Sequence, residues 1–200
     1  MGGVSRQYRR VACASGAIYG AIVRLLILTG QRREEVGGIL WSEIDLDKHV
    51  WRIDAERTKN RLAHDVPLSS LAVEILRRRE RSDRALVFGS RAGAFQGWSN
   101  AKSALDMRVL GKLREQGALK PWRLHDIRRT VATRMADLGV QPHVIEAVLN
   151  HISGHKAGVA GVYNRATYAA EKRAALVLWA EHVKAVTGAG SNVVPMKRAG

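Results

Sequence analysis

The order of apolar and polar positions along the chain predicts a mostly helical protein. Apolar residues recur at helical spacing over 12–28, and this run stops at Thr29 and Gly30, which is typical of a buried helix ended by glycine. The same spacing, together with capping residues, predicts further helices over 33–40, 69–79, 99–116, 125–138, 141–149 and 167–186.

A small sheet is predicted where short alternating segments replace the helical spacing, between residues 44 and 68. Strands over 49–54 and 63–66 flank a polar turn over 56–61, so the two strands are expected to form an antiparallel hairpin with Lys59 at its tip. The fold class predicted from these patterns is α+β: mostly α with a small antiparallel β-sheet.

The length of the chain favours one domain with two tails. Its 200 residues, 46% of them hydrophobic, suffice for one sizeable core, which we expect over 12–186 with flexible tails over 1–11 and 187–200. A membrane span is not expected, because Arg24 interrupts the most apolar stretch, 17–29. The first residues also lack the apolar segment of a secretory signal.

The charge of the chain points to a polyanionic partner. Thirty-three Lys and Arg against 18 Asp and Glu give a formal net charge of +15, and the isoelectric point is near 10.9. Nucleic acid is the default partner of such a chain, although a solvated basic surface without a ligand remains the alternative. Aromatic residues are too sparse for a single-strand stacking platform, which favours duplex DNA. The single cysteine, Cys13, excludes an intramolecular disulfide and fits a cytoplasmic protein.

One pair of residues suggests phosphate chemistry. His125 and Arg128 lie three residues apart at the start of a predicted helix, which places both side chains on one helix face. The exposed amides of a first helical turn add to their charge, so the pair suits an anionic phosphate. A capping histidine beside a surface arginine would explain the same residues.

Four segments resemble the tyrosine recombinases of the phage integrase family, in particular the prophage-type integrases. Residues 28–45 are similar to the first conserved box, T-G-x-R-x-x-E, and residues 122–136 to the H-x-x-R box. Residues 148–151 are similar to the L-G-H motif that follows, and 162–165 to the tyrosine motif. The family residues occur in the expected order over about 15–185: Arg, Lys, His, Arg, His and Tyr.

The resemblance implies the DNA breaking-rejoining fold and a site-specific recombinase. Tyr163 would attack a backbone phosphate of double-stranded DNA and form a 3′-phosphotyrosine, while Arg32 and Arg128 would bind the non-bridging oxygens. This intermediate conserves the ester bond, so integration or excision would need no cofactor.

The remaining roles implied by the resemblance concern proton transfer and orientation. Lys59 would protonate the leaving 5′ oxygen, His125 would assist proton transfer at the nucleophile, and His151 would hydrogen-bond the phosphate. Glu35 would orient Arg32. Candidate DNA-backbone contacts are Arg33, Arg61 and Arg129.

Two positions depart from the commonest family pattern. Tyr168 competes with Tyr163 as nucleophile, but in the prophage-type branch the attacking tyrosine is followed by Asn, as Tyr163 is. Asn150 stands where Gly is usual, and we expect it to be tolerated because Asn also adopts unusual backbone angles.

Other interpretations carry less weight. His151 and His155 have a four-residue spacing, but no further residue completes an ordinary zinc set, so no metal is expected. A DNA-binding remnant without strand exchange and a topoisomerase remain the alternative functions. The family's N-terminal core-binding domain is expected to be absent, and self-association on DNA, as a tetramer in the full-length enzyme, is implied by the resemblance.

Overall fold

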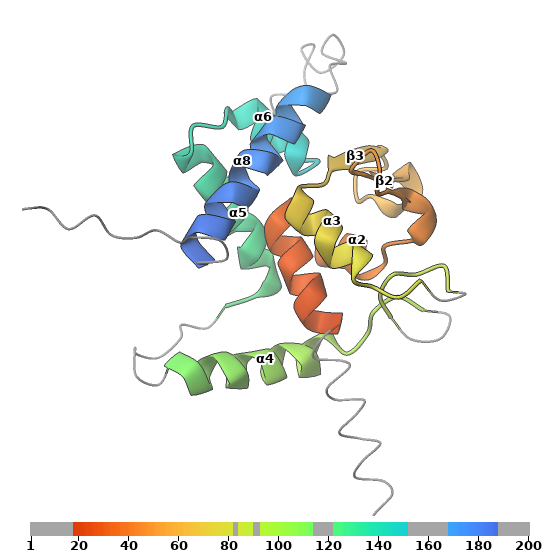
Figure 1. The fold of residues 1–200 in the computed structure, drawn as a ribbon, viewed down its shortest axis with the longest axis vertical. Helices are drawn as coiled ribbons and strands as arrows, with labels where there is room; N and C mark the ends of the chain where they lie inside the picture. The colour runs from red at the N-terminus through yellow and green to blue at the C-terminus, as the bar shows by residue number, and fades with distance from the viewer. Residues whose placement is uncertain (1–17, 82–83, 90–92, 114–121, 152–167, 188–200) are drawn as a thin grey trace, which may run out of the picture.

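The computed structural model describes residues 18–81, 84–89, 93–113, 122–151 and 168–187. A helix over residues 18–29 comes first. The further elements follow in chain order, and Figure 1 labels all of them except β1 and the 3-10 turns. They are α2 (Arg33–Gly37), β1 (Ile44–Asp45), β2 (Val50–Ile53), β3 (His64–Pro67), α3 (Ser70–Arg77), α4 (Trp98–Leu113), α5 (Leu124–Asp137), α6 (Pro142–Val148) and α8 (Ala169–Thr187), with short 3-10 turns at Trp41–Glu43 and Ala55–Arg57.

The core forms around the helix over residues 18–29, which lies at the centre of the described fold (Figure 1). Tyr19, Ile22 and Leu25 on this helix are almost fully buried. On the α8 side, the buried Trp179 donates a hydrogen bond from Nε1 to the Ile27 carbonyl at 2.7 Å. Apolar side chains of the first and the last described helices therefore pack into the same core.

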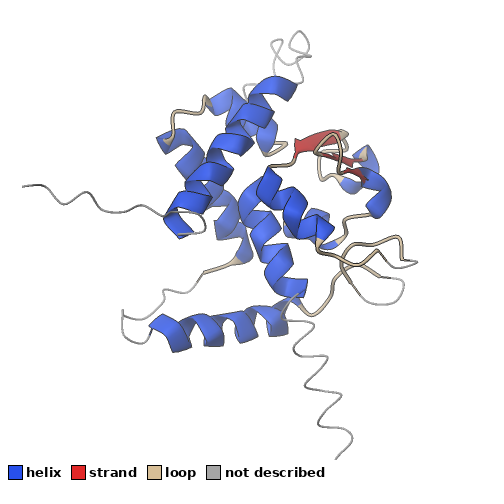
Figure 2. Ribbon diagram, viewed as in Figure 1, coloured by secondary structure: helices blue, strands red, loops and turns tan. Residues whose placement is uncertain are grey.

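The sheet is antiparallel and three-stranded, in the order β1-β2-β3. Trp51 pairs with Val66 and Ile53 with His64, and all four of these side chains are buried, whereas Arg52 between them is exposed. This alternation places one face of the hairpin on the core. Figure 2 shows this small sheet in an otherwise helical molecule.

The predicted fold class is confirmed, since the structure is mostly helical with a small antiparallel sheet. The predicted hairpin forms, and Ser69 caps α3 by accepting a hydrogen bond from the Ala72 amide at 3.4 Å. The sequence pattern did not predict β1, because two residues are too short to show a period.

The helix predicted over 33–40 was too long. It ends at Gly37, after which Gly38 adopts a non-helical conformation and Leu40 forms a β-bridge to Leu86. Two successive glycines carry a high entropic cost in a helix, which explains the early end. The bounds of the other described helices lie within two residues of the predicted ones. Two predicted ends cannot be compared, because residues 12–17 of the first predicted helix and 114–116 of α4 lie outside the described residues.

Candidate active site

The site is built around the turn that follows the helix over residues 18–29. Gly30 has φ +66°, and its amide donates to the Leu26 carbonyl at 2.9 Å. A Cβ at this position would lie 2.8 Å from Leu149 Cδ2 and 3.1 Å from Val131 Cγ1. Glycine is therefore required twice here, for its backbone angle and for the close approach of α5 and α6.

Arg32 is the N-cap residue of α2, and a buried carboxylate holds it. Glu35 is 4% exposed and accepts two hydrogen bonds from Arg32: from the backbone amide at 2.8 Å and from Nη1 at 2.9 Å. The Nη2 of Arg32 also donates to the Asn150 carbonyl at 3.4 Å. The carboxylate thus fixes the orientation of the guanidinium, as expected for a charge-assisted pair.

Arg128 lies on α5 and is only 8% exposed. Its Nη1 donates to the Gly30 carbonyl at 2.8 Å, and its Nη2 donates to the Leu149 carbonyl. Burial, and then the positive charge of Arg32, lower the pKa of Arg128 to about 10, so the side chain is still a cation at neutral pH. This guanidinium joins three elements of the fold beside Arg32.

The end of α6 approaches the same turn. Asn150 has φ +47°, the His151 amide donates to the Glu146 carbonyl at 3.0 Å, and the Asn150 amide donates to the Ala147 carbonyl at 3.3 Å. These two bonds form a Schellman motif with Asn150 in the left-handed position. Asn150 thus adopts the left-handed conformation on which the expected tolerance of asparagine rests, and His151 follows as an exposed residue.

Side chains from other elements satisfy the last carbonyls of α6. The Val148 carbonyl accepts from Gln31 Nε2 at 2.8 Å and from His64 Nε2 at 3.1 Å. Because a carbonyl only accepts, the Nε2 of His64 carries its proton. Burial first, and then the charge of Lys172, lower the pKa of His64 to about 3, so its ring is neutral at physiological pH.

Sequence reasoning missed the roles of Gln31 and His64. A signal for His64 was present, because it alternates with Val66 on the inward face of the predicted strand. Gln31 showed no such signal, since its partner lies 117 residues away.

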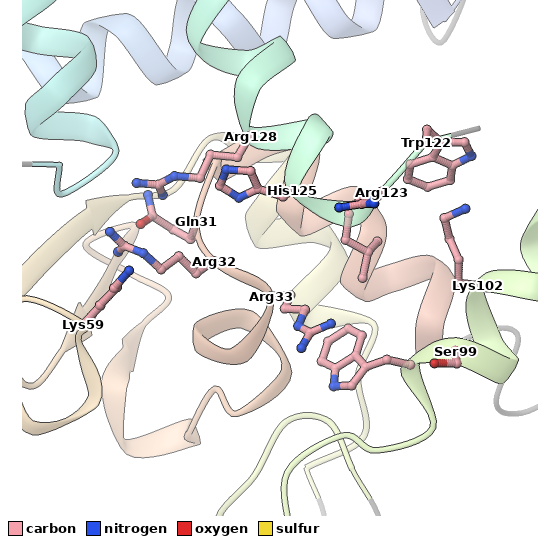
Figure 3. A pocket seen from close by; sticks show the side chains of 12 residues that line it. Gln31, Arg32, Arg33, Lys59, Ser99, Lys102, Trp122, Arg123, His125 and Arg128 are labelled. Atoms are coloured by element: carbon pink, nitrogen blue, oxygen red, sulfur yellow. The ribbon is translucent and has the colours of Figure 1, made fainter. Parts of the chain in front are cut away.

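A cavity of about 520 Å³ opens beside these arginines. Six of the described side chains that line it are cationic, and no described residue of the lining is acidic. The residues that line it are Gln31, Arg32, Arg33, Lys59, Trp98, Ser99, Lys102, Trp122, Arg123, Leu124, His125 and Arg128. Figure 3 shows the charged ends of Arg32, Lys59 and Arg128 directed toward one another at one end of the cavity, with the His125 ring close to Arg128.

The second end of the cavity combines aromatic rings with cations. Lys102 Nζ lies 3.9 Å from the Trp122 ring centroid and 2.6 Å from Asp106 Oδ2, and the Arg33 guanidinium lies 5.7 Å from the Trp98 ring centroid. The sequence did not predict this end, because it joins the start of α4 to the segment before α5 across a long stretch of chain.

Four further predicted site residues in the described part of the chain lie outside the cavity lining. Glu35 lies behind Arg32, and His151 is exposed past α6. Arg61 is exposed on the hairpin, and Arg129 is exposed on α5 with its Nη1 3.7 Å from Asp126 Oδ1. The cavity lining thus brings together four predicted catalytic residues and the predicted DNA contact Arg33, while Tyr163, the predicted nucleophile, lies outside the described residues.

Comparison with known proteins identifies the family. The phage integrase family matches residues 9–169, and the chain belongs to this family. The prophage integrase IntA of Escherichia coli K12 is 34% identical over 163 residues, covering 80% of this chain and 37% of that protein. The prophage integrase IntZ of the same strain is 30% identical over 186 residues, covering 92% of this chain and 44% of that protein. The chain thus spans less than half the length of these relatives.

Solved structures show the same fold. An integrase from mycobacterium phage Brujita aligns with a TM-score of 0.59 at 15% identity, over 82% of this chain and 52% of that one. The XerA recombinase aligns with a TM-score of 0.53 at 22% identity, over 78% of this chain and 57% of that one. The predicted resemblance to tyrosine recombinase catalytic domains is confirmed at the level of family and fold. Among the described helices, none combines the length and apolarity that crossing a membrane requires.

Proposed function

We propose that this chain is the catalytic domain of a site-specific tyrosine recombinase, which cuts and rejoins duplex DNA through a 3′-phosphotyrosine at Tyr163. The observation that carries the proposal is the gathering of Arg32, Lys59, His125 and Arg128 at one end of a cationic cavity. These residues come from α2, the hairpin and α5, and only the fold brings them together.

The two arginines bind the scissile phosphate. Arg32, oriented by Glu35, and Arg128, oriented by two backbone carbonyls, present fixed guanidinium groups to the non-bridging oxygens. Because both are preorganised and partly desolvated, they stabilise the charge that develops in the transition state.

Proton transfer falls to the remaining residues. Tyr163 forms the bond to phosphorus, and His125 accepts its proton. Lys59 gives a proton to the 5′ oxygen as the phosphorus–oxygen bond breaks. His151 donates a hydrogen bond to the phosphate from its exposed position beyond α6.

The partner is duplex DNA, and binding is largely electrostatic. The net charge of +15 and the cationic lining of the cavity support contacts to several backbone phosphates. Arg33, Arg61 and Arg129 contribute backbone contacts, and Arg33 also lines the cavity. The full-length protein acts in the cytoplasm and assembles as a tetramer on its DNA sites.

Tyr163 is proposed as the nucleophile in preference to Tyr168. The Tyr168 ring lies against the His143 ring at an interplanar angle of 52°, with centroids 5.2 Å apart, and the Tyr168 carbonyl accepts from the Lys172 amide at 2.8 Å at the start of α8. These contacts give Tyr168 a structural role at the junction of α6 and α8.

The test is a covalent-adduct assay with a nicked duplex that carries the attachment junction from the flanking DNA. The unaltered chain and Tyr168→Phe are expected to form a protein–DNA adduct, whereas Tyr163→Phe is expected to form none. An adduct that persists in Tyr163→Phe and disappears in Tyr168→Phe would reverse the assignment. If no variant and no unaltered chain reacts, the proposal of catalysis by this chain fails.

A further inference from the structure

An asparagine pair joins the hairpin tip to the end of α6. Asn150 Oδ1 accepts from Asn60 Nδ2 at 2.7 Å, and Asn60 Oδ1 accepts from Asn150 Nδ2 at 3.2 Å. Asn60 Nδ2 also lies 3.3 Å from the Asn150 carbonyl. Both side chains are partly buried, although 90 residues of sequence separate them. We call these two residues the amide clasp.

The Asn150 side chain is held in position by its backbone. Asn150 is the left-handed residue of the Schellman motif that ends α6, with φ +47°. Glycine adopts this conformation at lower cost, and asparagine adopts it more readily than other residues because its short polar side chain can form hydrogen bonds. The reciprocal bonds to Asn60 are possible only because a side chain is present.

The clasp acts on the neighbour of Asn60, which is Lys59. On one side of Lys59, Thr58 Oγ1 donates to the Ala55 carbonyl at 3.0 Å and lies 2.9 Å from the Leu62 carbonyl. The 3-10 turn before it is tied to α2 through Arg57 Nη2, which donates to the Glu35 carbonyl at 3.2 Å. On the other side, only the clasp connects the described tip to α6.

The clasp therefore connects the backbone next to Lys59 to the same segment that both arginines contact. Arg128 bonds the Leu149 carbonyl, and Arg32 bonds the Asn150 carbonyl, so both contact the peptide groups that carry the clasp. Lys59 itself is exposed and has a long, flexible side chain. The position of its backbone therefore decides which atoms its amine can reach.

We propose that Asn60 and Asn150 are positioning residues that hold Lys59 at the leaving 5′ oxygen during DNA cleavage, an inference that rests on the proposed function. In that step the Tyr163 oxygen bonds to phosphorus and the phosphorus–O5′ bond breaks. The departing electron pair takes a proton from the Lys59 ammonium, which becomes a neutral amine. Without the clasp, phosphate binding persists but this proton transfer becomes inefficient.

The experiment compares two nicked duplexes of the same sequence, one with the natural 5′ bridging oxygen and one with sulfur in its place. A thiol has a pKa of about 8.5, so a sulfur leaving group departs as the thiolate and needs no proton from Lys59. Asn60→Ala and Asn150→Gly are expected to slow single-turnover cleavage of the oxygen duplex by about tenfold to a hundredfold. Both are expected to cleave the sulfur duplex at the rate of the unaltered chain.

The controls separate positioning from damage. Lys59→Ala is expected to show a larger loss with the same rescue, and Asn100→Ala, at an exposed asparagine that does not line the cavity, is expected to cleave both duplexes normally. Asn150→Gly suits the left-handed backbone, so it removes the two side-chain bonds of the clasp without straining α6. The Asn60→Ala/Asn150→Gly double variant is expected to match the slower single variant.

Two results overturn the inference alone, and they are distinguishable from failure of the proposed function. Clasp variants that cleave the oxygen duplex at the unaltered rate show that the clasp is not needed. Clasp variants that are slowed by the same factor on both duplexes, relative to the unaltered chain, show general damage to the site. If Lys59→Ala is not rescued by sulfur, or if the unaltered chain forms no adduct, the proposed role of Lys59 or the proposed function fails, and the inference fails with it.

Discussion

Acid should destabilise this fold through one buried histidine. His64 is 5% exposed on β3, and its Nε2 proton is committed to the Val148 carbonyl. Burial, followed by the charge of Lys172 and with smaller contributions from Arg128 and Arg32, lowers the pKa of His64 to about 3. Protonation would place a further cation among three others in a dry site.

The magnitude follows from the difference between the folded and unfolded pKa. Unfolded histidine has a pKa of about 6.5, so below that pH the unfolded chain binds a proton that the native chain does not. The free energy of unfolding is therefore unaffected by His64 above about pH 6.5 and falls progressively as the pH drops to about 3. Between pH 7.5 and 5 the loss from this residue is about 2 kcal/mol.

The assay is urea unfolding at both pH values for the unaltered chain and for His64→Gln. Glutamine keeps an amide N–H that can donate to the Val148 carbonyl, but it does not titrate. The variant is expected to be less stable at pH 7.5, because its shape differs, and to lose about 2 kcal/mol less than the unaltered chain on moving to pH 5. If both proteins lose the same free energy, His64 does not titrate as its burial implies, and the reasoning is refuted.

Three further predictions test the turn, the arginines and the DNA contact. In urea titrations, Gly30→Ala should lower the free energy of unfolding by more than Gly139→Ala. Both glycines have a positive φ, but only at Gly30 would a Cβ meet neighbouring side chains. Equal losses for the two variants would contradict this. Arg32→Lys and Arg128→Lys should each reduce adduct formation by about a hundredfold or more, and Arg128→Lys should lower the free energy of unfolding further than Arg32→Lys, because Arg128 bonds two backbone carbonyls. Duplex binding should weaken by at least about tenfold between roughly 50 and 200 mM salt in a fluorescence titration, and salt-independent binding would exclude a phosphate interface.

Local patterns explain which parts of the structure were predictable. The helices and the hairpin follow from periodicity and caps, such as Ser69 before α3 and Pro142 at the start of α6. The family boxes singled out Arg32 and Arg128 before any geometry was known. A single sequence carries no local sign of contacts such as that between Gln31 and Val148, because they depend on how distant elements meet.

The amide clasp was predictable from the sequence only in part. The left-handed conformation of Asn150 could be expected from residue type alone, but its partner Asn60 could not, because the pairing depends on where the hairpin tip meets α6. The aromatic end of the cavity is a second example, since Lys102 and Trp122 lie on either side of residues 114–121, which are outside the described part of the chain.

The end of α6 has a consequence for how the protein loses activity. The carbonyls of Val148, Leu149 and Asn150, at and just past this end, accept hydrogen bonds from side chains of the α2 N-cap, the hairpin tip, β3, α5 and the turn before α2. A slip of α6 by one residue would break these bonds together, so intermediate arrangements are disfavoured. The proposed arginine and lysine site should therefore be lost on heating together with global melting, without an earlier stage in which a folded molecule has lost this arrangement.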